Sequence, residues 1–75
     1  MIDLFILKNC PFCRKVLDYL ETTDIEYRTI DISSAENAEA LKRIGGFEQV
    51  PFLLDKERNV QMYESADIIN YLKTL

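Results

Sequence analysis

The sequence opens with an almost unbroken apolar run, residues 2–7, which stops at Lys8-Asn9. Such a run is typical of a strand that is covered on both faces, because a strand with one wet face alternates apolar and polar residues. A chain of 75 residues has room for only one thin core. We therefore expect residues 1–75 to form a single α/β domain with this strand at the centre of its sheet.

Three further segments have the β-favouring composition of short strands, namely residues 25–32, 50–54 and 60–63. Residues 55–59 have the composition of a turn, so the last two strands are expected to form an antiparallel hairpin. The first two strands are separated by a helical pattern, which predicts a parallel crossover between them.

Three segments have apolar residues at the spacing of a helix that packs on a sheet. The first helix begins at the cysteine motif, with Pro11 in its first turn. The second follows a Ser33-Ser34 cap and stops at Gly45-Gly46, and the third is capped by Ser65. The apolar residues expected on the inner faces of the last two helices are Ala38, Leu41, Ile44, Ile68, Ile69 and Leu72, with Leu75 one turn further along.

The only two cysteines lie in the tetrapeptide Cys10-Pro11-Phe12-Cys13. A bridge that closes so short a loop removes little entropy from the unfolded chain, which favours chemistry over a structural role. The order β-α-β-α-β-β-α, with a Cys-x-x-Cys at the first strand-to-helix turn, is the layout of the thioredoxin fold. We therefore predict that fold, with a four-stranded mixed sheet flanked by three helices.

Cys10 is the predicted nucleophile. It lies just before the first helical turn, where free backbone N–H groups and the helix dipole lower the pKa of a thiol. Lys8 would add a cation nearby. Cys13, about one turn further along, should be more buried and less ionised. In the expected reaction Cys10 attacks a disulfide, and Cys13 or an external thiol resolves the mixed disulfide.

Two other interpretations of the cysteine pair have less support. A zinc site needs two further Cys or His ligands, and the chain has no His and no other Cys, so we expect no metal. Two inert buried cysteines would not explain why the pair falls where a strand ends and a helix begins.

Together with Val50-Pro51 and the start of the last helix, the cysteine motif makes the sequence resemble a glutaredoxin over its whole length. The motif differs from the common Cys-Pro-Tyr-Cys of that family by one hydroxyl. The resemblance implies glutathione as a co-substrate, no bound cofactor, and a glutathione site beside Cys10 that includes Pro11 and Phe12. It also implies a cis Val50-Pro51 bond, with the valine backbone paired to the cysteinyl part of glutathione.

The pair Glu64-Ser65 departs from the usual glutaredoxin Gly-Gly-x-Asp and resembles the Glu-Ser of glutathione transferase N-terminal domains. The resemblance implies that Ser65 and the helix start bind the γ-glutamyl carboxylate and that Glu64 meets the ammonium. Gln49 matches the Gln-Val-Pro of the same domains and is a further candidate. The candidates for the glycine carboxylate are Lys8, Lys42 and Arg43.

The implied function is a glutathione-dependent thiol–disulfide oxidoreductase that reduces protein disulfides and glutathione mixed disulfides. One alternative is a glutathione transferase, which would need a helical domain that we do not expect after Leu75. Another is a glutaredoxin-like electron donor to ribonucleotide reductase, recharged by thioredoxin reductase, which would not need Glu64-Ser65. A third is an iron–sulfur protein that shares a cluster between two chains through Cys10, which Pro11 disfavours in the family.

The composition limits the partners. Thirteen acidic and nine basic side chains give a net charge of −4, so the chain lacks the basic surface that a nucleic acid requires. No apolar run approaches the roughly 20 residues of a membrane span, and the first residues lack the pattern of a secretory signal. We therefore expect a cytoplasmic monomer that binds neither nucleic acid nor membrane.

Overall fold

Strand β1 (Ile2–Ile6) lies between two neighbouring strands in the computed structural model, which describes residues 1–75. It pairs in parallel with β2 (Tyr27–Asp31) and antiparallel with β3 (Phe52–Asp55). Strand β4 (Val60–Tyr63) pairs antiparallel with β3, so the sheet order is β2-β1-β3-β4. The predicted arrangement, a parallel pair first and a hairpin last, is therefore present.

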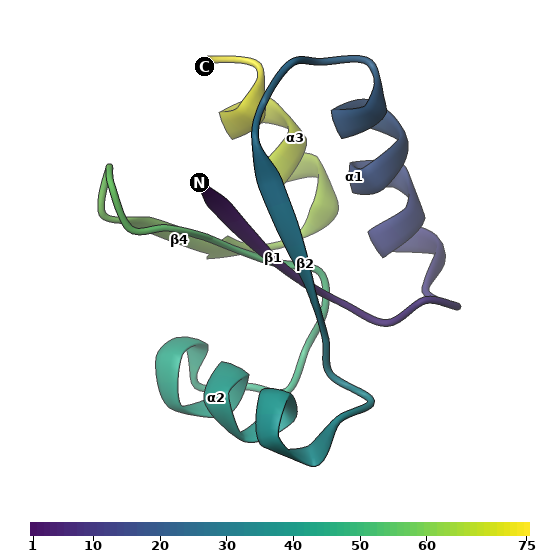
Figure 1. Ribbon diagram of the computed structural model, residues 1–75, viewed down its shortest axis with the longest axis vertical. Helices are drawn as coiled ribbons and strands as arrows, with labels where there is room; N and C mark the ends of the chain where they lie inside the picture. The colour runs from purple at the N-terminus through teal and green to yellow at the C-terminus, as the bar shows by residue number, and fades with distance from the viewer.

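The helices α1 (Pro11–Glu21), α2 (Ala35–Gly45) and α3 (Ser65–Leu72) cover both faces of this sheet. Figure 1 shows α1 and α3 on one face and α2 on the other. The larger core lies under α1 and α3 and contains Ile2, Leu4, Ile6, Cys13, Val16, Leu20, Leu53, Ile68 and Leu72. The smaller core, under α2, contains Phe5, Leu41 and Phe52. Strand β1 contributes to both cores, and all five of its residues are buried, with Asp3 paired to Arg28 rather than packed in a core.

The end of β1 differs from the predicted one. Leu7, expected in the strand, is 38% exposed because β1 ends at Ile6. The Leu7 carbonyl instead accepts the Cys10 N–H at 3.2 Å. This hydrogen bond turns the chain out of the sheet and toward the start of α1.

Two further apolar residues that were expected inside are exposed, Ile44 by 39% and Leu75 by 44%. The core on the α2 face is small, and Leu41 is the one residue of α2 that is buried in it. The next residue, Gly45, still lies against Phe52 and Tyr63, so the sheet reaches this end of α2 but leaves the Ile44 side chain partly uncovered. Helix α3 ends at Leu72, so Leu75 no longer follows the helical spacing.

The serines expected to cap α2 and α3 make no side-chain capping hydrogen bond. Ser34 does occupy the N-cap position of α2. Helix α3 has Glu64 as its N-cap, one residue before the predicted Ser65, because the Glu64 carbonyl accepts the Ile68 N–H at 2.9 Å. Ser65 is therefore the first helical residue, and no side chain occupies the N–H groups at this helix start.

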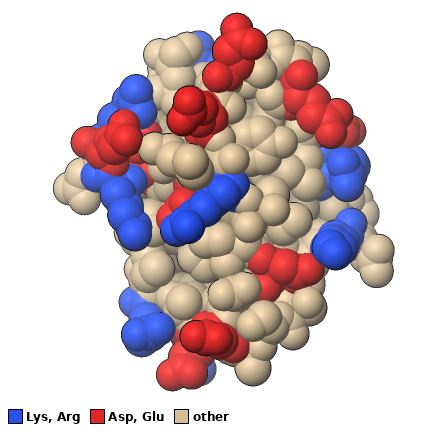
Figure 2. Space-filling view, viewed as in Figure 1, with Lys and Arg blue, Asp and Glu red and all other residues tan.

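Charges of both signs are mixed over the face of the molecule shown in Figure 2. The ion pairs of the structure include Arg28 with Asp3 at 2.7 Å and Arg14 with Asp18 at 3.7 Å. This face therefore has no basic patch of the kind that follows a phosphate backbone.

None of the three helices combines the length and the apolar composition needed to cross a membrane.

Asp55, the last residue of β3, is a carboxylate in the protein interior, only 1% exposed. Its Oδ2 accepts hydrogen bonds from the Tyr71 hydroxyl at 2.7 Å and from Arg58 Nη1 at 3.0 Å. Burial acts to raise the pKa of Asp55, but the hydrogen bonds from Tyr71 and Arg58 outweigh it and hold the pKa below its ordinary value. This network ties the β3–β4 hairpin to α3.

The Tyr71→Phe variant removes one hydrogen bond to the buried carboxylate and keeps the ring. We expect it to lose about 1.5 kcal/mol of unfolding free energy near neutral pH, measured by urea denaturation. The lowered pKa of Asp55 gives stability that is present above its unfolded pKa and is lost as the pH falls through its folded pKa, so the deficit should shrink in acid. Tyr19→Phe on α1 removes a hydroxyl without a hydrogen-bond partner and should lose little. An equal loss in both variants would contradict the role of the network.

Candidate functional site

Cys10 is the N-cap residue of α1, with extended backbone angles of φ −85° and ψ 118°. Its carbonyl accepts the Arg14 N–H at 3.0 Å, the first hydrogen bond of the helix. Pro11 follows at the start of the helix, where its missing N–H removes no hydrogen bond. The N–H groups of the first turn are therefore left without helical partners beside the Cys10 sulfur.

The Cys10 thiol is half-buried, and its pKa lies below the ordinary cysteine value. Desolvation is the largest single influence and raises this pKa, but the backbone N–H of Cys13, the Cys13 thiol and the backbone N–H of Phe12 together outweigh it. The sulfur closes no capping hydrogen bond of standard geometry. The N–H groups of Phe12 and Cys13 belong to the positive end of the helix, which favours the thiolate.

The Cys13 thiol is fully buried in the larger core, and its pKa is raised to about 11. Burial is the largest cause, and the hydrogen bond and charge of Cys10 add to it, whereas the backbone N–H of Leu7 acts in the opposite direction. The two sulfurs thus differ in the way predicted: Cys10 is accessible and acidic, and Cys13 is buried and protonated.

Cys10 lines a hollow of about 470 Å³, here called the thiol hollow, together with Leu7, Lys8, Asn9, Asp31 and Ser33. The Asp31 carboxylate accepts the Ser33 N–H at 2.9 Å. This hydrogen bond is the main cause that lowers the pKa of Asp31, and Lys8 adds a smaller electrostatic effect. Lys8 is not among the groups that lower the pKa of Cys10. The expectation that Lys8 makes Cys10 more acidic is therefore not supported.

A second hollow, of about 520 Å³, is here called the cis-proline groove. Its lining residues are Phe12, Lys15, Gln49, Val50, Pro51, Glu64, Ser65 and Ala66. The Val50-Pro51 bond is cis, as expected, but both residues precede β3, which begins at Phe52. Gln49 Nε2 donates a hydrogen bond to Glu64 Oε1 at 3.2 Å and so joins two walls of the groove. Glu64 has φ 72°, a left-handed conformation that is uncommon outside glycine.

Tyr63, the last residue of β4, holds the segment between α2 and β3 in place. Its hydroxyl donates to the Phe47 carbonyl at 2.6 Å and accepts the Phe47 N–H at 3.1 Å. Its ring packs against Phe52, with ring centroids 4.6 Å apart. Gly45 leaves space for this ring, because a Cβ at that position would overlap the Tyr63 hydroxyl and lie 2.9 Å from the Phe52 ring. The segment that leads to Gln49 is therefore anchored to β4.

The predicted site residues fall into two hollows. Lys8 and Cys10 line the thiol hollow, whereas the cis-proline groove contains Phe12, Gln49, Val50, Pro51, Glu64 and Ser65. Pro11 is exposed and lines neither hollow, and Cys13 is buried. Lys42 and Arg43 lie in the last turn of α2 and line neither hollow, so the structure does not bring them to the site.

Other residues line these hollows but are not predicted from the sequence, notably Lys15 and Asp31. Lys15 follows Phe12 by three positions, so helical spacing alone places the two side chains on the same face of α1. Asp31 is the last residue of β2, which runs parallel to β1. Because the carboxyl ends of neighbouring parallel strands meet at one edge of a sheet, Asp31 could have been expected near the residues that follow β1.

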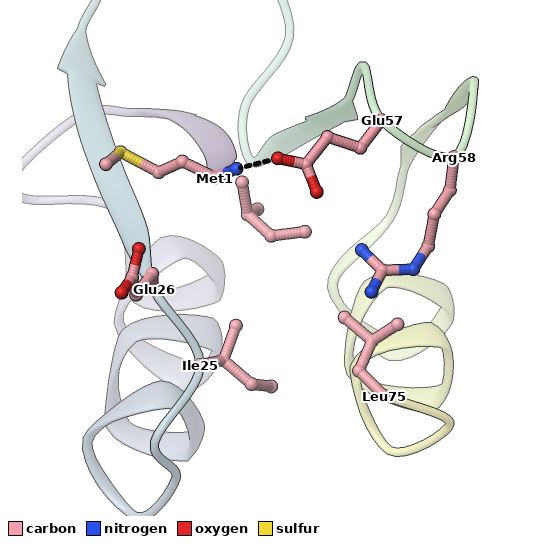
Figure 3. Close-up of a pocket in the computed structure, with 7 residues that line it drawn as sticks. Met1, Ile25, Glu26, Glu57, Arg58 and Leu75 are labelled. Carbon is pink, nitrogen blue, oxygen red and sulfur yellow. Dashed lines mark hydrogen bonds and ion pairs between the residues drawn. The ribbon is translucent and has the colours of Figure 1, made fainter.

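A third hollow, of about 260 Å³, lies at the other end of β1, where both chain ends meet. Figure 3 shows the Met1 ammonium directed at the Glu57 carboxylate, 3.0 Å away, with Leu75 on the opposite wall. The hollow contains neither cysteine and none of the predicted site residues, so we assign it no role.

No group of three or more His, Cys, Asp or Glu side chains is placed to hold a metal ion.

The Tyr63→Phe variant tests the anchor on the α2–β3 segment. It removes both hydrogen bonds to Phe47 and keeps the aromatic packing, so the unfolding free energy should fall by about 1 kcal/mol. The Phe47 amide should also exchange its hydrogen faster, because its acceptor is lost. Hydrogen exchange followed by NMR measures this, with Tyr27→Phe as a control on β2. Unchanged protection of the Phe47 amide would show that the Tyr63 hydroxyl does not hold this segment.

Comparison with known proteins places this geometry among thioredoxin-like proteins. A solved thioredoxin-like protein superposes with a TM-score of 0.82 at 18% identity, over 100% of this chain and 97% of that one. The glutaredoxin-like protein NrdH-redoxin from Escherichia coli superposes with a TM-score of 0.77 at 25% identity, over 95% of this chain and 92% of that one. The predicted thioredoxin fold is thus confirmed.

Sequence comparison identifies the family of the chain. Prostaglandin E synthase 2 of Mus musculus is 29% identical over 75 residues, which cover 97% of this chain and 19% of that protein. The chain therefore spans about a fifth of the length of this curated relative. Residues 4–75 match the model of the glutathione S-transferase N-terminal domain. Since that match covers nearly the whole chain, the protein belongs to the family of glutathione S-transferase N-terminal domains.

Proposed function

We propose that the protein is a glutathione-dependent thiol–disulfide oxidoreductase of the glutaredoxin type, with Cys10 as nucleophile and Cys13 as resolving thiol. The observation that carries this proposal is that the pKa values of the two thiols are shifted in opposite directions. Cys10 is accessible and its pKa is lowered, whereas Cys13 is buried and its pKa is raised to about 11. Thiolates attack disulfides, whereas thiols scarcely do. Cys10 is therefore suited to attack the substrate, and Cys13 stays protonated until the second step.

In the proposed reaction the Cys10 thiolate attacks one sulfur of a substrate disulfide. The substrate S–S bond breaks, a Cys10–substrate disulfide forms, and the other substrate sulfur leaves as a thiolate that takes a proton from water. Cys13 then loses its proton and attacks the Cys10 sulfur, which releases the second substrate thiol and forms a Cys10–Cys13 disulfide. Two glutathione molecules supply the two electrons that reopen this disulfide, and they leave as glutathione disulfide.

The attack by Cys10 also makes the later attack by Cys13 easier. Burial is the largest influence that raises the pKa of Cys13, and the neighbouring Cys10 thiolate adds to it. Once Cys10 is part of a mixed disulfide it carries no charge, so this contribution disappears. The Leu7 N–H, which lowers the pKa of Cys13, stays in place. Cys13 therefore becomes easier to ionise at the moment when it has to attack.

We place glutathione in the cis-proline groove, which Gln49 and Phe12 also line. The Val50 backbone before Pro51 would pair with the cysteinyl residue as a strand pairs with its neighbour. The uncapped start of α3, at Ser65, favours a carboxylate, and the Glu64 side chain favours an ammonium group. Lys8 and Pro11 would contact the tripeptide where it approaches Cys10.

The protein would carry no bound cofactor and would use glutathione as a co-substrate. Its other substrates would be disulfide-bonded or glutathionylated proteins. It would act as a cytoplasmic monomer, without nucleic acid or membrane as a partner.

Two further candidate functions are each favoured by one observation. The likeness to NrdH-redoxin, a glutaredoxin-like protein with a thioredoxin-like activity profile, favours an electron donor recharged by thioredoxin reductase. Ribonucleotide reductase would then be an acceptor. The family match favours a transferase, which joins the thiol of glutathione to an electrophile and needs no resolving cysteine. The three candidates differ in the role of Cys13 and in the reductant.

Single serine variants test the roles of the two sulfurs. Cys10→Ser removes the nucleophile and should lower every reductase activity by about two orders of magnitude or more. Cys13→Ser should keep the reduction of a glutathione mixed disulfide, because a second glutathione resolves that intermediate, but should lose the reduction of protein disulfides. Coupled assays with glutathione and glutathione reductase measure both activities. Equal losses in the two variants, or no loss in either, would contradict the assigned roles.

The choice of reductant separates the oxidoreductase proposal from the electron-donor alternative. We expect glutathione to reduce the oxidised Cys10–Cys13 pair faster than thioredoxin reductase does, because the cis-proline groove offers charges of both signs and a free helix start. The measurement is the rate of NADPH oxidation with each reductase system at matched concentrations. Faster reduction by thioredoxin reductase would favour the alternative.

A further inference from the structure

Lys15 is a cation that lines the cis-proline groove and has no role in the reaction proposed above. It lies in the first turns of α1 and lines the groove together with Glu64 and Ser65 of the β4–α3 junction. The side chain is exposed and takes part in none of the four ion pairs of the structure. Its neighbour Arg14, by contrast, is paired with Asp18 at 3.7 Å and does not line the groove.

The Lys15 ammonium is held near the groove wall by an aromatic ring. Its Nζ lies 5.5 Å from the centroid of the Phe12 ring, within the range of a cation–π interaction. Phe12 itself lines the groove and is 56% exposed. The contact therefore restricts a flexible side chain without satisfying its three N–H donors.

The groove also contains an anion that has no ion-pair partner. The Glu64 carboxylate accepts a hydrogen bond from the neutral Gln49 amide at 3.2 Å, and it forms no ion pair with Lys15. One cation and one anion thus line the same space of about 520 Å³ and remain unpaired. The uncapped start of α3 adds N–H donors on the side of Ser65. A group with adjacent positive and negative charges complements this arrangement.

We propose that Lys15 binds the α-carboxylate of the γ-glutamyl residue of glutathione, opposite Glu64, and so makes the groove selective for a free α-amino-acid head group. This inference rests on the placement of glutathione in the cis-proline groove proposed above. Lys15 and the start of α3 would share the carboxylate, and Glu64 would take the ammonium. Tripeptides that lack either charge should bind more weakly, because one groove charge would lose its partner.

The test uses the Lys15→Met variant, which keeps the length of the side chain and removes its charge. The KM for glutathione should rise about fivefold, the size expected for one exposed charge-assisted contact, with kcat nearly unchanged. For 4-aminobutyryl-cysteinyl-glycine, which is glutathione without the α-carboxylate, the variant and the natural protein should have the same KM. Lys15→Arg should restore most of the affinity for glutathione, and added salt should reduce the difference between Lys15→Met and the natural protein.

Three results would overturn the assignment. One is an unchanged KM for glutathione in Lys15→Met. Another is an equal rise for both tripeptides, which would mean that Lys15 does not act on the α-carboxylate. The third is the same rise in the matched control Arg14→Met, which would indicate a general effect of surface charge. The pH profile of Cys10 alkylation should stay the same in Lys15→Met, because Lys15 is not among the groups that shift the pKa of Cys10.

A binding measurement keeps this inference separable from the proposed function. S-methylglutathione cannot exchange its sulfur, so its NMR titration reports the groove alone. If turnover with glutathione fails but S-methylglutathione binds about fivefold more weakly to Lys15→Met than to the natural protein, the oxidoreductase proposal is wrong and the Lys15 assignment stands. If the natural protein does not bind S-methylglutathione, the Lys15 assignment is wrong, whatever the reductase assays show.

Discussion

Helix α1 has Cys10 at its N-cap, and the N–H groups that this helix cannot use internally are the partners that a thiolate needs at that position. The Leu7 carbonyl, which accepts the Cys10 N–H, and Pro11, at the helix start, together fix where the helix begins. Strand β1, which leads into this turn, is held between two strands and between two cores. The acidity of Cys10 therefore depends on the most deeply buried strand of the fold.

The cis-proline groove depends on different contacts. Its walls come from the start of α1, the segment before β3 and the β4–α3 junction. The last two walls are joined by the Gln49–Glu64 hydrogen bond and by the two hydrogen bonds between Tyr63 and Phe47. None of these groups shifts the pKa of Cys10. Substitutions in these two walls can therefore test the proposed glutathione site without altering the acidity of Cys10, whereas Phe12 lines the groove and also lowers the pKa of Cys10 through its N–H.

The spacing of apolar residues predicts the element order and the central strand. The helix start at the cysteine motif predicts the contrast between Cys10 and Cys13. Hydrophobicity does not say where an element stops, so Leu7, beyond the end of β1, and Leu75, beyond the end of α3, were wrongly expected inside. Glu64 rather than Ser65 caps α3 because the Glu64 carbonyl accepts the Ile68 N–H. The positive φ of Glu64 is uncommon outside glycine, so the sequence does not signal it. The contacts of Tyr63 could not be predicted from the sequence because they join residues 16 positions apart along the chain. Lys15 contacts Phe12 on its own helix, but its place in one groove with Glu64 depends on the fold.

The most direct test of the central claim is an NMR titration of isotope-labelled cysteine β-carbons, which follows both thiols separately in the reduced protein. The N–H groups at the start of α1 should hold the pKa of Cys10 below the ordinary cysteine value, while burial and the Cys10 thiolate keep the pKa of Cys13 near 11. Two similar pKa values close to the ordinary one, or a higher pKa for Cys10 than for Cys13, would contradict it.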